Sequence, residues 1–178
     1  MAIKIAYFVH GTTVDNEKGL STGQAHGELS PLGIQQSKEL PLKIKEKKFD
    51  VVFCSDLKRA VDSAEISFGN AYKIIQDKRL RECNYGKFNQ TPEENVKYEE
   101  HITKPFPQGE SLKDVEKRIA NFIQFLKKNY NGKHVAIVAH KATQFAFEVL
   151  TKNKTWEQAI AEDWRKRKAW QPGWEYFI

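Results

Sequence analysis

Short apolar runs and longer amphipathic stretches follow one another along the chain. The apolar runs are too short for helices and contain many β-branched and aromatic residues, so they predict strands. These strands are expected at residues 3–9, 51–54, 72–75, 134–139 and 174–178. The amphipathic stretches predict helices over residues 31–44, 56–68, 93–101, 111–131, 143–150 and 155–168. Strands that alternate with helices indicate an α/β architecture, here as one domain over residues 1–178, with the last strand at a sheet edge.

Several of these helices are supported by residues typical of helix ends or by apolar residues that recur with the helical period. Ser111, with Asp114 three residues later, resembles a capping box at the start of the longest helix. Either Ser55 or Asp56 is expected to cap the helix that follows the second strand. In the first helix, the apolar residues that fit a helical period include Leu32.

Two of the predicted strands end in a histidine. His10 follows the first apolar run, and His140 follows the run that ends at residue 139. The carboxyl ends of parallel strands meet at one edge of a sheet, where ligands bind in such folds. Arg59 lies in the first turns of the helix after residues 51–54, so its side chain can reach the same edge. Either histidine alone could simply end a strand, but the two together with Arg59 favour a functional site.

Composition narrows the class of protein. Of 178 residues, 40% are apolar and 29% are charged, which is typical of a soluble globular protein, and no apolar run is long enough to cross a membrane. The first residues show no signal-peptide cleavage pattern, and Cys54 and Cys83 form neither a disulfide framework nor a metal motif, so a cytoplasmic location is expected. The net charge of +6 suits an anionic partner. We interpret the basic, aromatic segment 164–170 as a polar helix face with two tryptophan anchors rather than a nucleic-acid site.

Six segments, taken in order, resemble the motifs of the histidine phosphatase superfamily, whose fold is phosphoglycerate mutase-like. They are Val9-His10-Gly11-Thr12-Thr13-Val14-Asp15-Asn16, Leu29-Ser30-Pro31-Leu32-Gly33, residues 54–64, Leu80-Arg81-Glu82 with Tyr85-Gly86, Gly109-Glu110-Ser111, and residues 135–140. The resemblance covers nearly the whole chain. It implies a three-layer α/β/α sandwich with a mostly parallel central sheet and an edge strand.

The same resemblance assigns roles to individual residues. It implies that His10 attacks phosphorus and becomes a phosphohistidine, that Glu82 is the general acid, and that His140 stabilises the charge that develops on the transferring group. Glu82 would have to be protonated when the ester binds, and its alternative role is a salt bridge to Arg79 or Arg81. The expected phosphate-binding residues are Arg59, Asn16, Gly11, Thr13 and Lys141. No metal and no cofactor are expected.

Two positions depart from the family pattern in ways that affect the chemistry. Val9 stands where the family has an arginine before the first histidine, and Lys141 stands where glycine is common after the second. Loss of a charged donor from a phosphate site costs on the order of 10²–10³ in rate, by analogy with oxyanion donors. Lys141 could supply the missing charge, or it could be a solvent-facing lysine at the start of a helix.

The sequence therefore predicts a phosphomonoester hydrolase that acts on a small phosphorylated metabolite, without a membrane partner. One alternative is a catalytically impaired member that binds phosphorylated ligands, which Val9 supports. A phosphoglycerate mutase-type phosphotransferase is a second alternative, although the chain leaves little room for the insertions expected in mutases. A nucleic-acid-binding protein is disfavoured because it leaves the two strand-end histidines unexplained. The oligomeric state is left open.

Overall fold

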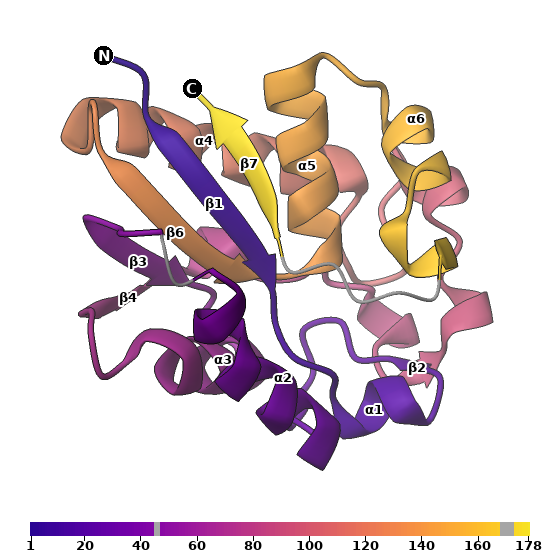
Figure 1. Ribbon diagram of the computed structural model, residues 1–178. Coiled ribbons are helices and arrows are strands. Elements are labelled where there is room, and N and C mark those ends of the chain that lie inside the picture. The colour runs from indigo at the N-terminus through magenta and orange to yellow at the C-terminus, as the bar shows by residue number, and fades with distance from the viewer. Residues whose placement is uncertain (45–46, 168–172) are drawn as a thin grey trace.

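The computed structural model describes residues 1–44, 47–167 and 173–178, and Figure 1 shows a central sheet with helices on both faces. Its strands are β1 (Lys4–Val9), β3 (Val51–Cys54), β4 (Ile74–Gln76), β6 (His134–Ala139) and β7 (Trp174–Phe177), in the spatial order β4-β3-β6-β1-β7. The β1–β6, β3–β6 and β3–β4 pairs are parallel, and β7 pairs antiparallel with β1 at the edge. This confirms the predicted α/β/α sandwich with its mostly parallel sheet and edge strand.

Four long helices cover the two faces of the sheet. They are α2 (Pro31–Lys43), α3 (Lys58–Phe68), α4 (Leu112–Asn129) and α5 (Lys141–Lys152). Successive side chains of β1 point to opposite faces, as the two-residue period of a strand requires. Ile5 and Tyr7 belong to the apolar cluster that includes α4 and α5, whereas Ala6 and Phe8 belong to the cluster that includes α2 and α3. The continuous apolar run of β1 is therefore buried on both sides, as its sequence predicts.

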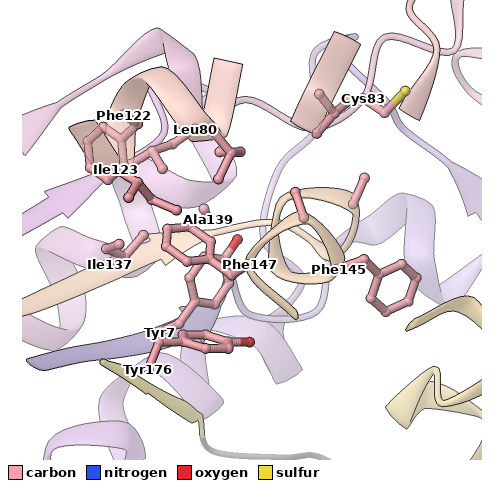
Figure 2. Packing of buried hydrophobic residues seen from close by; sticks show 14 of the residues in the cluster. Tyr7, Leu80, Cys83, Phe122, Ile123, Ile137, Ala139, Phe145, Phe147 and Tyr176 are labelled. Carbon is pink, nitrogen blue, oxygen red and sulfur yellow. The ribbon is translucent and has the colours of Figure 1, made fainter. Parts of the chain in front are cut away.

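Aromatic packing fixes α5 against the centre of the sheet. Figure 2 shows Tyr7 of β1 beside Phe147 of α5 and Tyr176 of β7. The ring centroids of Tyr7 and Phe147 are 5.3 Å apart, and those of Phe147 and Tyr176 are also 5.3 Å apart. Burial of one such side chain contributes about 1.5–3 kcal/mol. The start of α5, where His140 lies, is thus held rigidly relative to the end of β1.

The helix boundaries confirm one predicted cap and correct another. In α4, the Ser111 hydroxyl accepts from Asp114 N at 3.1 Å, and the Asp114 carboxylate accepts from Ser111 N at 2.9 Å. The α3 helix begins later than predicted, with Leu57 at its N-cap and no side-chain cap. The Ser55 hydroxyl instead accepts from Leu57 N, and Asp56 is paired with an arginine outside the helix. The prediction that Ser55 or Asp56 caps this helix is therefore wrong.

The remaining elements are short. They are α1 (Val14–Glu17), β2 (Leu20–Ser21), β5 (Thr91–Pro92), α6 (Trp156–Ala161) and the 3₁₀ helices η1 (Lys78–Leu80), η2 (Gly86–Phe88), η3 (Glu93–Asn95), η4 (Tyr98–His101) and η5 (Trp164–Arg167). The predicted helix 93–101 is two separate 3₁₀ turns. The predicted helix 155–168 breaks after Ala161 and resumes as η5, while residue 168 and the second tryptophan anchor, Trp170, lie outside the described residues.

Candidate active site

The two strand-end histidines lie side by side. Val9 is in register with Ala139 across the β1–β6 pair, and His10 N continues the ladder by donating to Ala139 O at 3.0 Å. The next residue on each chain segment is a histidine, so the two rings meet with centroids 5.1 Å apart. The sequence predicts this convergence, and it follows from the parallel pairing of β1 and β6, which lie side by side in Figure 1.

The hydrogen bonds of His10 fix its tautomer. Nδ1 lies 2.7 Å from Gly11 O, and because a carbonyl oxygen only accepts, Nδ1 carries the proton. Nε2 accepts from Arg59 Nε at 3.3 Å. Burial, and to a smaller degree the charge of Arg59, lowers the pKa of His10 to about 3. The ring is therefore neutral near pH 7, with the Nε2 lone pair directed toward the guanidinium group.

His140 is fully buried, and its ring nitrogens have no hydrogen-bond partner among the described residues. Its backbone is held firmly, because Tyr7 Oη donates to His140 O at 2.8 Å and accepts from His140 N at 3.2 Å. Burial and the charge of Arg59 lower the pKa of His140 well below its ordinary value. Buried polar atoms normally have partners, so this ring is suited to a ligand that enters beside His10.

Arg59 reaches the site from α3 and is only 2% exposed. Besides its contact with His10, its Nη2 donates to Gly23 O at 2.6 Å and its Nη1 donates to Ala25 O at 3.4 Å. These bonds tie the loop after β2 to the floor of the site. Burial lowers the pKa of this guanidinium from its ordinary value, but arginine remains charged in proteins.

Glu82 is buried and turned toward the N-terminus of α5. Its Oε1 accepts from Cys83 N at 2.8 Å and from Ala142 N at 3.1 Å, while Oε2 accepts from Lys141 N at 3.2 Å. Three backbone donors hold the carboxyl group in one orientation beside the two histidines. Two of them belong to the free N–H groups of a helix start, which favour anionic groups.

The alternative role for Glu82, a salt bridge to a neighbouring arginine, is wrong. Arg79 pairs with Asp77 at 2.5 Å, and Arg81 pairs with Asp56 at 2.6 Å. Glu82 is thereby left to face the pocket.

A pocket of about 630 Å³ opens over the histidines. The predicted residues on its wall are His10, Arg59, Glu82, Asn16 and Lys141. His140 lies beneath them, in ring contact with His10.

Gly11 and Thr13 shape the opening loop instead of lining the pocket. Gly11 N donates to Ser63 Oγ at 3.0 Å, and the fully buried Thr13 caps α1 by accepting from Asn16 N at 3.0 Å. The Gly11 N–H is therefore used within the fold, and Thr13 is buried away from the pocket.

Lys141 is not the solvent-facing lysine of the alternative interpretation. Its side chain is 16% exposed, its Nζ lies 3.5 Å from Asp163 Oδ2, and the same nitrogen lies 4.4 Å from the centre of the Tyr98 ring. Burial, followed by the charge of Arg165, lowers the pKa of Lys141 to about 8. The ammonium group therefore stands on the pocket wall and is mostly charged at neutral pH.

One wall of the pocket comes from the 84–108 segment and the tryptophan-rich tail, which the sequence interpretation expected to contact substrate without naming individual residues. Asp163, Trp164, Arg165 and Lys166 line it from the C-terminal side, and Glu93 lines it from η3. The sequence interpretation placed 164–170 on a polar helix face, and the break after α6 turns its first residues into the pocket. No local signal predicts this, because the contacts cross long stretches of chain.

The described part of the chain contains no cluster of three or more His, Cys, Asp or Glu residues that could hold a metal ion. None of its helices has the length and apolar character of a membrane span. Cys54 and Cys83 are free and buried. Burial raises the pKa of Cys54 to about 12 and raises that of Cys83, so both thiols are inert at neutral pH.

Comparison with known proteins agrees with this geometry. A profile of the histidine phosphatase superfamily (branch 1) matches residues 7–147, which include His10, Arg59, Glu82 and His140. Phosphoserine phosphatase 1 of Hydrogenobacter thermophilus is 28% identical over 149 residues, or 78% of this chain and 71% of the relative. A 2,3-bisphosphoglycerate-dependent phosphoglycerate mutase of Cytophaga hutchinsonii is 29% identical over 146 residues, or 74% of this chain and 68% of the relative.

The same fold occurs in a crystal structure of a phosphoserine phosphatase mutant from Entamoeba histolytica in complex with phosphoserine. The two structures align with a TM-score of 0.78 at 23% identity, over 89% of this chain and 84% of the other. With a family profile that spans most of its length and two histidines that meet at the sheet edge, the chain belongs to the histidine phosphatase superfamily.

Proposed function

We propose that the protein hydrolyses small phosphomonoesters through a phosphohistidine at Nε2 of His10. The observation that carries this proposal is the state of His10: neutral, with Nδ1 tied to a carbonyl and Nε2 facing Arg59. A neutral imidazole whose Nε2 carries no proton is a competent nucleophile toward phosphorus. A fixed Nδ1–H also stabilises the positive charge that the ring acquires during attack.

In the first half-reaction, the Nε2 lone pair forms the N–P bond while the P–O bond to the alcohol breaks. Arg59 exchanges its contact with Nε2 for the phosphoryl oxygens, and the unpartnered ring of His140 stabilises their developing charge. Glu82, which must carry a proton when the ester binds, donates that proton to the departing oxygen. In the second half-reaction a water attacks phosphorus, Glu82 takes its proton, and phosphate leaves with the ring neutral again.

Asn16 and Lys141 complete the proposed phosphate site. Asn16 lines the pocket and uses its Oδ1 to accept from Thr13 N, so the hydrogens on its Nδ2 are what it offers to phosphate. Lys141 offers a charge in the pocket that Val9 also lines, and Val9 is the position where the family has arginine.

The role of Lys141 predicts a pH effect. Because burial and the Arg165 charge lower its pKa to about 8, its positive charge is lost as the pH rises through that value. Inhibition by inorganic phosphate should then weaken by about 10-fold above pH 8 in the wild type, and a Lys141→Arg variant should retain it. Inhibition constants measured across this range provide the test. An unaltered phosphate affinity in Lys141→Ala would remove Lys141 from the site.

The proposed chemistry is tested with p-nitrophenyl phosphate. His10→Ala should lower kcat at least about 10³-fold, because no nucleophile remains. His26→Ala is the matched control, since His26 is an exposed loop residue paired with Glu28, and it should leave kcat unchanged. A labelled phosphoryl group should be trapped as an acid-labile adduct on the wild type and not on His10→Ala.

Equal release of phosphate by the wild type and His10→Ala would favour the binding-only alternative. Transfer of the phosphoryl group to a second phosphorylated molecule, faster than release to water, would favour the phosphotransferase alternative. In the described part of the 164–170 segment, Lys166 Nζ donates to Ile160 O and Arg165 lines the pocket, which argues for a small-molecule site over a nucleic-acid surface. A cytoplasmic location remains a proposal, supported by the two free thiols.

A further inference from the structure

Four charged residues meet at the mouth of the pocket, and we call Glu93, Lys141, Asp163 and Arg165 the rim cluster. Arg165 Nη1 lies 2.9 Å from Glu93 Oε1, and Arg165 Nε lies 3.6 Å from Asp163 Oδ2. Asp163 Oδ2 also lies 3.5 Å from Lys141 Nζ. All four residues line the pocket that contains His10, so they can contact whatever the pocket binds.

The two acids of the rim cluster are held very differently. The side chain of Asp163 is 11% exposed and contacts both cations, which makes it a fixed part of the wall. The side chain of Glu93 is 41% exposed and reaches Arg165 from η3. Exposed ion pairs contribute little to stability, so Glu93 can leave Arg165 at small cost.

The charges of the rim cluster cancel while Glu93 is in place. With Glu93 displaced, two cations face one acid, and the cluster carries one net positive charge with an open guanidinium edge. A planar guanidinium fork with a single net charge matches a carboxylate. Glu93 therefore occupies the place that a ligand carboxylate would take.

Arg165 and Glu93 lie apart from the phosphoryl site, and Lys141 joins the two, since its N donates to Glu82 Oε2 and its Nζ lies 3.5 Å from Asp163 Oδ2. Arg59 donates to Nε2 of His10 directly, whereas the described side-chain contacts of Arg165 are with the carboxylates of Glu93 and Asp163. A substrate that fills both sites must carry two anionic groups with a spacer between them.

We propose that the rim cluster binds a substrate carboxylate, which displaces Glu93 from Arg165, and that the protein acts on phosphomonoesters that also carry a carboxylate. This inference rests on the proposed phosphatase function and assigns a specificity role to Arg165, which contacts the substrate away from the reacting atoms. Glu93 acts as an internal competitor for the same guanidinium.

The test uses O-phosphoserine and O-phosphoethanolamine, which differ only by the carboxylate. Arg165→Gln should raise the KM for phosphoserine about 10-fold and change that for phosphoethanolamine less than about 2-fold. Glu93→Gln should lower the KM for phosphoserine several-fold, because the competitor is removed, and should leave phosphoethanolamine unchanged. A purely structural ion pair would not give opposite signs for its two partners.

Glu175→Gln is the matched control, because Glu175 is also 41% exposed and lies 2.9 Å from Lys47 in a surface pair away from the pocket. It should change neither KM. Arg165→Lys, which keeps the charge and loses the fork, should give an intermediate KM for phosphoserine. Thermal unfolding of each variant identifies any that fails to fold, and the Glu93→Gln arm remains decisive in that case.

Shifts of the same direction in Arg165→Gln and Glu93→Gln, or equal effects on both substrates, would overturn the proposal. Failure of the proposed function gives a different pattern, since the wild type would then release no phosphate from any of the esters. In that situation, calorimetry can still measure the affinity of the wild type and the two variants for phosphoserine. The affinity should fall in Arg165→Gln and rise in Glu93→Gln, and any other result would overturn the rim-cluster proposal as well.

Discussion

The carboxyl group of Glu82 is fixed by three backbone donors and faces the pocket, so its proposed role as general acid can be tested through the leaving group. A p-nitrophenolate ion leaves without a proton, whereas an alkoxide does not. Glu82→Gln should therefore lower kcat/KM for an alkyl phosphate by about 10²–10⁴, and for p-nitrophenyl phosphate by less than about 10-fold. Steady-state kinetics on both esters measure this, and an equal loss on the two would remove Glu82 from proton transfer.

For single residues, the sequence predicts the positions of those that lie at the ends of strands and helices. It does not predict which residues meet only through tertiary contacts. His10 and His140 each follow an apolar strand directly, so the parallel arrangement alone brings them together. Arg165 meets Glu93 across 72 positions of the chain, and no local pattern encodes that contact. Gly11 is a third kind of case, since its amide is used by Ser63, a partner that only the fold reveals.

Among the elements, α2 shows why an apolar period can mislead. Leu32, which fits the predicted stripe, is 51% exposed, whereas Gly33 is buried where the helix crosses the loop after β1. A side chain at this glycine would overlap the backbone of Thr12. The absence of a side chain, rather than an apolar side chain, brings this helix against the loop that carries Thr12 and Asn16. A period of apolar residues cannot indicate such a contact.

This contact reverses the usual effect of a substitution. In an exposed helix, alanine in place of glycine stabilises by about 1 kcal/mol, but Gly33→Ala must push Thr12 away and should destabilise the protein by about 1–3 kcal/mol. Urea denaturation followed by circular dichroism measures the change. Leu32→Ala on the same helix is the control and should stay within about 0.5 kcal/mol of the wild type. A Gly33→Ala protein as stable as the wild type would show that the loop moves freely.

For the whole molecule, the sequence predicts the layered α/β/α fold because the apolar pattern within each strand indicates how the strands and helices are arranged. Runs buried on both faces require a parallel sheet with helices on each side, and the last strand, with its polar Glu175, fits an edge. The pocket mouth is less predictable, since it is built from 3₁₀ turns and a broken helix whose positions depend on packing. The sequence therefore predicts the fold and the meeting of His10, His140 and Arg59. It does not predict the pocket wall that would select the substrate.

Burial of neutral histidines should also make global stability depend on pH. The pKa of His10 is lowered to about 3 and that of His140 well below its ordinary value, so the unfolded chain binds more protons than the folded protein below about pH 6.5. Stability therefore rises with pH in this window and is lost as the pH falls below about 6.5, by up to about 1.4 kcal/mol for each pH unit and each histidine. The window lies above the range in which ordinary carboxylates titrate, so the histidines dominate it.

Urea denaturation at several values between about pH 7 and pH 5 should show this slope in the wild type. His10→Asn should reduce it, because one of the buried neutral rings is removed. The slope that remains belongs to His140 and to His134, whose pKa burial also lowers. His26→Ala, which changes only an exposed ring, should leave the slope as it is. A wild-type stability that is flat across this window would mean that the two imidazoles are not desolvated together at the sheet edge, and the neutral nucleophile on which the mechanism depends would lose its physical basis.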